Sequence, residues 1–208
     1  LMLVIDASGS MANYVGSDQK IQLAIEGVRA AIRALKDEDV VGVLGFDAKI
    51  KMEIPPTADH VSIIHKVGEL RPGGGTKMYP ALKRAYEQLK DIDAKQKHIV
   101  LLSDGKSDGD FIPLAKQIAA DKISVTTIAI GDAVQELMKA IAEAGKGNYT
   151  YVQNVSQLPR VFANEVRQTQ KYTIQEPFQP VVSEGGQPIL AGIDQFPKLY
   201  GYIATSEK

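Results

Sequence analysis

Short runs of apolar residues alternate with amphipathic segments through most of this chain. Four runs are rich in Val, Ile and Leu and contain no charged residue, at residues 1–5, 40–46, 99–102 and 123–130. Runs of this length are typical of strands buried on both faces of a sheet. Ile21, Ile25, Val28 and Ile32 recur at steps of four and three, which places them on one face of a helix.

Residues 50–54 follow a different pattern, in which apolar and charged residues alternate. This period predicts a half-exposed strand. Because only three residues separate it from the preceding run, we expect a hairpin and therefore an antiparallel edge strand. Pro55 and Pro56 are expected to end this strand, and Thr57 to cap the helix that follows.

The remaining segments continue the alternation. Helices are expected within residues 61–67, 82–89, 113–121 and 134–144, a short strand at 149–152, and a final helix over 156–170 capped by Ser156. The pattern as a whole predicts an α/β fold, doubly wound, with a mostly parallel sheet, helices on both faces and one antiparallel edge strand.

Residues 171–208 depart from the alternating pattern of strands and helices, because they contain four prolines and a Gly185-Gly186 pair. We expect one domain over residues 1–170, and an extension or the start of a following domain over 171–208. The chain opens directly on a buried strand, so we also expect it to be a piece of a longer protein.

Composition narrows the function. The chain has 208 residues, 44% of them hydrophobic and 24% charged, as in ordinary globular proteins. Lys and Arg number 24 against 25 Asp and Glu, so there is no basic excess for nucleic acid. The absence of cysteine excludes disulfides, zinc–cysteine sites and thiol nucleophiles. No apolar run approaches the ~18 residues of a membrane span, so no direct membrane insertion is expected.

Polar residues gather where the predicted strands end. Asp6, Ser8 and Ser10 follow the first strand, Asp104 follows the strand at 99–102, and Thr76 closes a Gly73-Gly74-Gly75 loop between them. In doubly wound folds, ligands bind at the carboxyl ends of the strands. Carboxylate and hydroxyl oxygens suit Mg²⁺, or Mn²⁺ or Ca²⁺, better than zinc or copper.

These residues resemble the metal-ion-dependent adhesion site (MIDAS) of von Willebrand factor type A (VWA) domains. That family's pattern is D-x-S-x-S in the first loop, Thr in the second and Asp in the third. All five positions match here, as Asp6, Ser8, Ser10, Thr76 and Asp104. The resemblance covers about residues 1–169.

The resemblance implies a role for each residue. Ser8 and Ser10 would coordinate the ion directly, and Thr76 directly or through water. Asp6 and Asp104 would be direct ligands or anchors behind them. One position would stay open for an Asp or Glu carboxylate of a partner protein, which makes the expected function cation-dependent protein binding in adhesion or assembly.

Other interpretations compete with this one. Asp6 and Ser8 could simply cap a helix without metal, the site could be unused in a structural domain, or the metal could serve a hydrolase. The phosphate-binding G-x-x-x-x-G-K-[ST] and nucleophile-elbow G-x-S-x-G motifs are absent, so no enzyme is expected.

Residues 171–208 also indicate what kind of protein the domain comes from. Residues 179–182 and 199–202 resemble the stretch after the A domain in large bacterial membrane proteins. This resemblance implies a membrane-tethered parent with the domain on its extracytoplasmic face.

Overall fold

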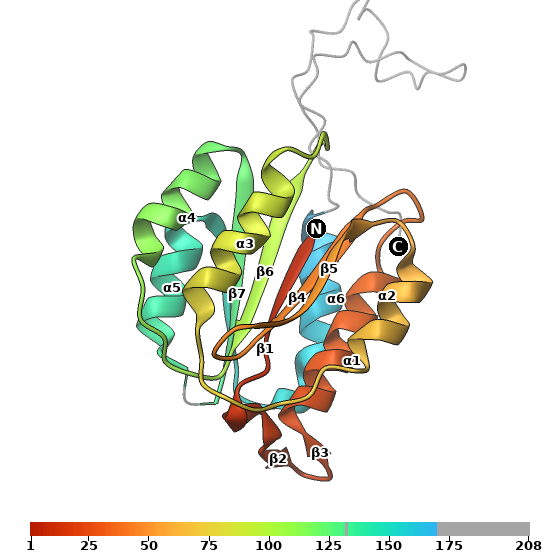
Figure 1. The fold of residues 1–208 in the computed structure, drawn as a ribbon, viewed down its shortest axis with the longest axis vertical. Coiled ribbons are helices and arrows are strands. Elements are labelled where there is room, and N and C mark those ends of the chain that lie inside the picture. Colours follow the sequence, from red (N-terminus) through yellow and green to blue (C-terminus); the bar gives the residue numbers. More distant parts are fainter. Residues whose placement is uncertain (132, 170–208) are drawn as a thin grey trace, which may run out of the picture. The chain divides into compact units, whose positions relative to one another are not determined.

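A six-stranded sheet forms the centre of the protein in a computed structural model that describes residues 1–131 and 133–169 (Figure 1). Its order is β5-β4-β1-β6-β7-β8, and every neighbouring pair is parallel except β4 with β5. The strands are β1 (Met2–Asp6), β4 (Val41–Phe46), β5 (Ile50–Thr57), β6 (Lys97–Ser103), β7 (Ile123–Ile130) and β8 (Lys146–Val152). The doubly wound α/β fold and its antiparallel edge strand are therefore confirmed.

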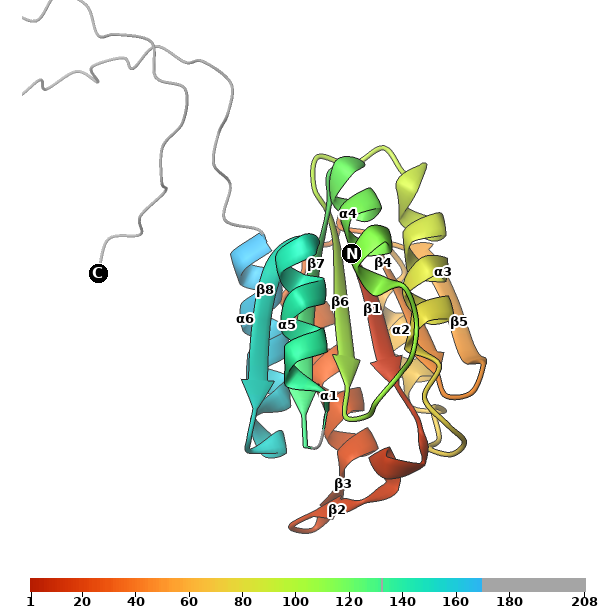
Figure 2. The same ribbon diagram turned by 90° about the vertical axis from the view of Figure 1, so that its left-hand side faces the viewer.

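Helices cover both faces of this sheet (Figure 2). One face carries α1 (Lys20–Arg33), α2 (His60–Val67) and α6 (Leu158–Thr169). The other carries α3 (Met78–Lys90), α4 (Phe111–Ala120) and α5 (Gln135–Ala144). Successive residues of β1 point to opposite faces of the sheet. Leu3 packs in the core with α1, α2 and α6, and Val4 packs in the core with α3, α4 and α5. Within the described ranges, every helix falls short of the length and apolar character that a bilayer span requires.

Several boundaries differ from the prediction. Pro55 and Pro56 lie inside β5, because the register with β4 shifts between Val41 and Val43 and the strand is at an edge, where proline is tolerated. The α2 cap is Asp59, whose side chain accepts a hydrogen bond from the Ser62 N–H. Thr57 instead accepts one from the Asp59 N–H.

The start of α6 also differs. A 3₁₀ turn, η2 (Val155–Gln157), precedes the helix. Asn154, rather than the predicted Ser156, caps this turn by accepting a hydrogen bond from the Ser156 N–H. The predicted boundary at 170/171 stays a prediction, because residues 170–208 lie outside the described part of the chain.

The segment after β1 contains structure that the sequence pattern did not predict. A 3₁₀ turn, η1 (Gly9–Ala12), is followed by a small antiparallel hairpin of β2 (Tyr14–Val15) and β3 (Asp18–Gln19). Gly16 turns this hairpin with φ of 65°. The hairpin leads directly into α1 and so fixes where that helix begins.

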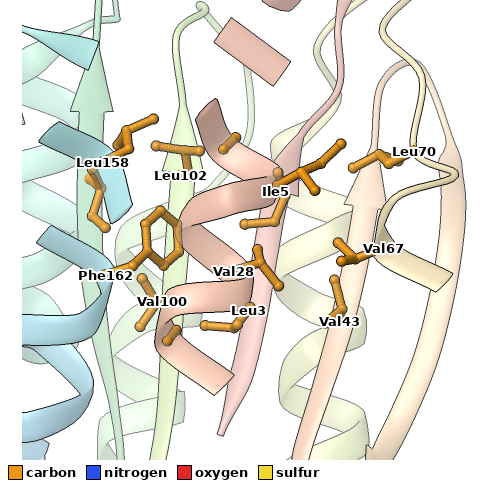
Figure 3. Packing of buried hydrophobic residues seen from close by; sticks show 14 of the residues in the cluster. Leu3, Ile5, Val28, Val43, Val67, Leu70, Val100, Leu102, Leu158 and Phe162 are labelled. Carbon is orange, nitrogen blue, oxygen red and sulfur yellow. The ribbon is translucent and has the colours of Figure 1, made fainter. Parts of the chain in front are cut away.

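Close packing joins α1 to α6 (Figure 3). Phe162 of α6 is fully buried, and a Cβ placed on Gly27 of α1 would lie 2.7 Å from its Cδ2 atom. Glycine is therefore required at position 27 for space, although it costs a helix about 1 kcal/mol relative to alanine.

Gly27→Ala is expected to destabilise the protein. The gain in helix propensity of about 1 kcal/mol is exceeded by overpacking against Phe162, which costs about 1–3 kcal/mol. Urea denaturation should show a lower midpoint. In a Phe162→Leu background, the same change should be neutral or stabilising. A higher midpoint for Gly27→Ala alone would contradict this packing.

His98 is a buried titratable group near the start of β6, at the opposite end of that strand from the predicted site. Its Nδ1 atom lies 2.6 Å from the Ser124 hydroxyl, and its Nε2 atom is buried without a hydrogen-bond partner among the described residues. Burial lowers the pKa of His98 to about 3, so the folded state keeps the ring neutral.

Acidification should therefore cost stability through His98. Between pH 6.5 and about 3 the unfolded chain binds this proton and the folded one does not. The loss approaches about 1.4 kcal/mol per pH unit below pH 6.5. Urea denaturation at several pH values from 7 to 5 gives the free energy of unfolding as a function of pH. This free energy should fall less steeply with decreasing pH for His98→Leu than for the original protein. His65→Gln, at an exposed position, should show the same fall as the original protein. If the free energy of unfolding fell equally with pH in His98→Leu and in the original protein, a lowered pKa of His98 would be contradicted.

Candidate functional site

The candidate site lies where the winding of the sheet reverses. From β1 the chain moves outward to β4 and β5, then returns to β6 on the other side of β1 and continues to β7 and β8. Ile5 of β1 is in register with Leu102 of β6. The next residues, Asp6 and Ser103, therefore emerge side by side at the carboxyl ends of the two strands, where such folds place ligands.

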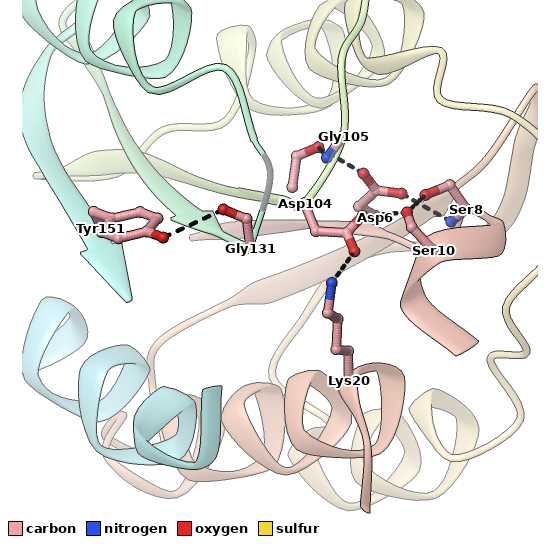
Figure 4. A network of polar contacts seen from close by, with 9 residues as sticks. Asp6, Ser8, Ser10, Lys20, Asp104, Gly105, Gly131 and Tyr151 are labelled. Atoms are coloured by element: carbon pink, nitrogen blue, oxygen red, sulfur yellow. Dashed lines mark hydrogen bonds and ion pairs between the residues drawn. The ribbon is translucent and has the colours of Figure 1, made fainter. Parts of the chain in front are cut away.

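Asp6 joins these two strands (Figure 4). Its Oδ1 accepts a hydrogen bond from the Ser8 N–H at 2.8 Å, and its Oδ2 accepts one from the Ser103 hydroxyl at 2.6 Å. Burial raises the pKa of the Asp6 carboxyl, and the hydrogen bonds from Ser103 and Ser8 offset part of that rise. Both of its oxygens are thus used to hold the loops together.

Ser8, Ser10 and Asp104 form a connected row of oxygens. The Ser8 and Ser10 hydroxyl oxygens lie 3.1 Å apart, and Ser10 donates to Asp104 Oδ1 at 2.5 Å. Ser8 and Asp104 are buried. Residues 94 positions apart in the sequence are thereby brought into direct contact.

The glycine loop before α3 is tied to the first loop by its backbone. Gly73 N–H donates to the Ala7 carbonyl at 2.8 Å, and Gly9 N–H donates to the Gly74 carbonyl at 2.9 Å. Gly74 has φ of 80°, and a Cβ there would lie 2.7 Å from Asp47 Oδ2. A larger residue would therefore disturb this loop through both its backbone and its side chain.

Thr76 reaches the third loop at the end of this glycine segment. A Cβ on Gly105 would lie 2.8 Å from the Thr76 hydroxyl oxygen, so Thr76 packs directly against the residue after Asp104. Met78 N–H donates to the Ser107 hydroxyl at 3.0 Å and fastens the start of α3 to the same loop. The five residues of the predicted site thus lie at the end of β1 and on three loops that contact one another.

The donors of this site fit a hard divalent cation. Ser8, Ser10 and Thr76 supply hydroxyl oxygens, and Asp6 and Asp104 supply buried carboxylates. Within residues 1–131 and 133–169, no cluster of three or more His, Cys, Asp or Glu side chains could hold a metal ion. Hydroxyls would therefore have to make up part of the ligand set, which suits Mg²⁺ or Mn²⁺ better than a soft metal.

Two residues of this site were missed by sequence reasoning. The first is Ser103, which directly precedes Asp104 and donates its hydroxyl hydrogen bond to Asp6. The second is Lys20, whose ammonium lies 2.8 Å from Asp104 Oδ2. Nothing in the sequence pattern shows that a lysine at the start of a helix will meet a carboxylate 84 residues later.

The sequence of this chain is similar to a known domain family and to proteins of other organisms. The model of the von Willebrand factor type A domain family matches residues 1–106. An uncharacterized protein of Synechocystis, sll0103, is 30% identical over 170 residues, which cover 78% of this chain. The chain spans only 39% of the length of that relative.

Solved structures have the same fold. An aerotolerance-related membrane protein from Bacteroides fragilis aligns with a TM-score of 0.70 at 19% identity, over 80% of this chain and 98% of that one. Proximal thread matrix protein 1 of the mussel byssus, in a form with a zinc-occupied MIDAS motif, aligns with a TM-score of 0.67 at 18% identity, over 84% of this chain and 48% of that one. At such identities the structures show the fold alone. The family model, which matches about half of the chain, shows together with this fold that the chain belongs to the von Willebrand factor type A domain family.

Proposed function

We propose that this domain binds a divalent cation, Mg²⁺ or Mn²⁺, at Asp6, Ser8, Ser10, Thr76 and Asp104, and uses it to bind an acidic residue of a partner protein. The observation that carries this proposal is the row of Ser8, Ser10 and Asp104 oxygens at the switch point of the sheet. A bound cation would supply an electrophilic position open to a carboxylate oxygen.

The donor set supports a partner that carries negative charge. Three of the five proposed ligands are hydroxyls, which bring no charge to the ion. Both oxygens of Asp6 are occupied by Ser8 and Ser103, so we propose that Asp6 acts mainly by holding the first loop. A cation held in this way stays incompletely neutralised and favours an anionic oxygen ligand.

The surface beside the site supports a protein partner. Tyr14 on the β2–β3 hairpin is 68% exposed, although it is a large aromatic side chain. Tyrosine is enriched in protein interfaces because it combines a wide apolar face with a polar tip. The hairpin follows the first site loop directly, so a partner bound at the cation would be near it (Figure 2).

The arrangement favours binding over hydrolysis. A metal-dependent hydrolase needs a general base beside the metal-bound water. Asp104 is engaged by Ser10 and Lys20, and Asp6 by Ser8 and Ser103, so both carboxylates already hold the loops and Lys20 in place. A structural domain with an unused site remains the other alternative, and metal titration separates it from our proposal.

We further propose that the domain belongs to a longer, membrane-tethered bacterial protein and lies on its extracytoplasmic face. The similar Bacteroides structure is of a membrane protein, and residues 179–182 and 199–202 resemble sequences from large bacterial membrane proteins. The division into residues 1–170 and 171–208 belongs to the same proposal.

Cation binding should stabilise the fold. An ion that binds only the native state adds about 2.7 kcal/mol at a hundredfold excess over Kd, which raises Tm by several degrees. Differential scanning fluorimetry with Mg²⁺ or Mn²⁺ should show this rise, and EDTA should reverse it. Asp6→Ala and Ser8→Ala should abolish it, while Ser17→Ala at the exposed hairpin tip should keep it. An unchanged Tm in excess Mg²⁺ and Mn²⁺ would reject the site.

The hydrolase alternative predicts a different result. We expect the Mg²⁺-loaded or Mn²⁺-loaded chain to cleave p-nitrophenyl phosphate and p-nitrophenyl acetate no faster than Thr76→Ala, because both carboxylates of the site already hold its loops and Lys20 in place. Absorbance assays at matched protein concentration measure this directly. Turnover that disappears in Asp104→Ala would replace the binding module with a metalloenzyme.

A further inference from the structure

The Asp104 carboxylate is shared between two partners. Its Oδ1 accepts from Ser10 on the side of the proposed cation ligands, and its Oδ2 pairs with the Lys20 ammonium at 2.8 Å (Figure 4). The Asp104 side chain is fully buried and that of Lys20 is only 12% exposed. Solvent and salt therefore screen this ion pair much less than a surface pair.

The surrounding fold places Lys20 here against the preference of its own helix. Lys20 is the first residue of α1, where the helix dipole disfavours a positive charge. Its N–H donates to the Asn13 carbonyl at 2.9 Å, which holds the helix start against the segment before the hairpin. Gly131, directly after β7, has φ of 57°, and a Cβ there would lie 2.9 Å from the ammonium, so the Lys20 side chain ends close to this backbone. The pair with Asp104 offsets the unfavourable position.

Lys20 changes the charge that the site offers to an ion. Asp6 and Asp104 carry two formal negative charges, and the ammonium cancels one of them. A cation beside Ser8 and Ser10 would therefore be held less strongly and would keep more of its own positive charge. Because Asp104 is buried, this effect acts at a lower dielectric than at the surface.

We propose that Lys20 sets the charge balance of this site: it lowers the affinity for the divalent cation and raises the affinity of the loaded site for a carboxylate. The inference rests on the proposed cation-dependent function. It makes Lys20 a specificity-determining residue that acts through Asp104. A lysine with only a structural role would not move the two affinities in opposite directions.

The test compares lysine variants of the 208-residue chain. Lys20→Met removes the charge and keeps a long unbranched side chain, and Lys20→Arg keeps the charge. Lys106→Met is the matched control, because Lys106 is exposed and lies two residues after Asp104 on the same loop. Mn²⁺ binding is measured by the loss of its free electron paramagnetic resonance signal. Acetate binding to the Mn²⁺-loaded protein is measured by relaxation of the acetate methyl protons.

Lys20→Met should bind Mn²⁺ about tenfold more tightly, equivalent to about 1.4 kcal/mol, and should bind acetate several-fold more weakly. Lys20→Arg and Lys106→Met should match the original chain in both. In an Asp104→Asn background, Lys20→Met should no longer tighten Mn²⁺ binding, since the carboxylate through which Lys20 acts is absent. Circular dichroism confirms folding, and Lys20→Gln provides a second neutral variant if Lys20→Met unfolds.

The other possible outcomes reject either the inference alone or the inference together with the proposed function. If the original chain binds Mn²⁺ and the neutral variants bind it equally or more weakly, the inference is wrong and the proposed function stands. If Mn²⁺ binding tightens but acetate affinity is unchanged, Lys20 only competes with the cation and the inference is also wrong. If no Mn²⁺ binds to the original chain or any variant, the proposed function fails together with the inference.

Discussion

The parallel pairing of β1 with β6 is the constraint on which the rest of the site depends. It ends both strands at the same edge of the sheet, so that Asp6 and Ser103 meet and their hydrogen bond closes the junction. The first and third loops then have one relative position, in which Ser10 contacts Asp104. The two buried faces of the sheet keep this register, because a shift of one residue would exchange the core positions of Leu3 and Val4.

Burying two carboxylates at this junction costs desolvation free energy, which the protein offsets in two ways. Asp6 is surrounded by hydrogen-bond donors from Ser8 and Ser103, and Asp104 is paired with Lys20. A buried carboxylate without such partners would destabilise the fold strongly. The same contacts that make these carboxylates tolerable also determine how much negative charge reaches the hydroxyls of Ser8 and Ser10.

Glycine positions show how closely the site loops approach each other. Gly74 adopts a left-handed backbone beside Asp47, and Gly105 leaves space for the Thr76 hydroxyl. Gly131 lies directly beside the Lys20 ammonium. Each of these contacts joins segments that are distant in sequence, so each glycine is explained by a neighbour that the local sequence does not reveal.

The sequence by itself predicted the fold class and the antiparallel edge strand, because both follow from local periodicity. It also indicated the candidate oxygen-bearing residues, since Asp6, Ser8, Ser10 and Asp104 stand where apolar strands end and Thr76 closes a glycine loop. Local reasoning placed the caps at Thr57 and Ser156, whereas Asp59 and Asn154 have the geometry to accept the backbone hydrogen bonds. Only the tertiary structure decided which partner each site oxygen has. The Lys20–Asp104 pair spans 84 residues and depends on the β2–β3 hairpin, the start of α1 and the space at Gly131 together. Periodicity reports which face of an element is buried, but an ion pair of this kind exists only after the sheet order has brought separate elements together.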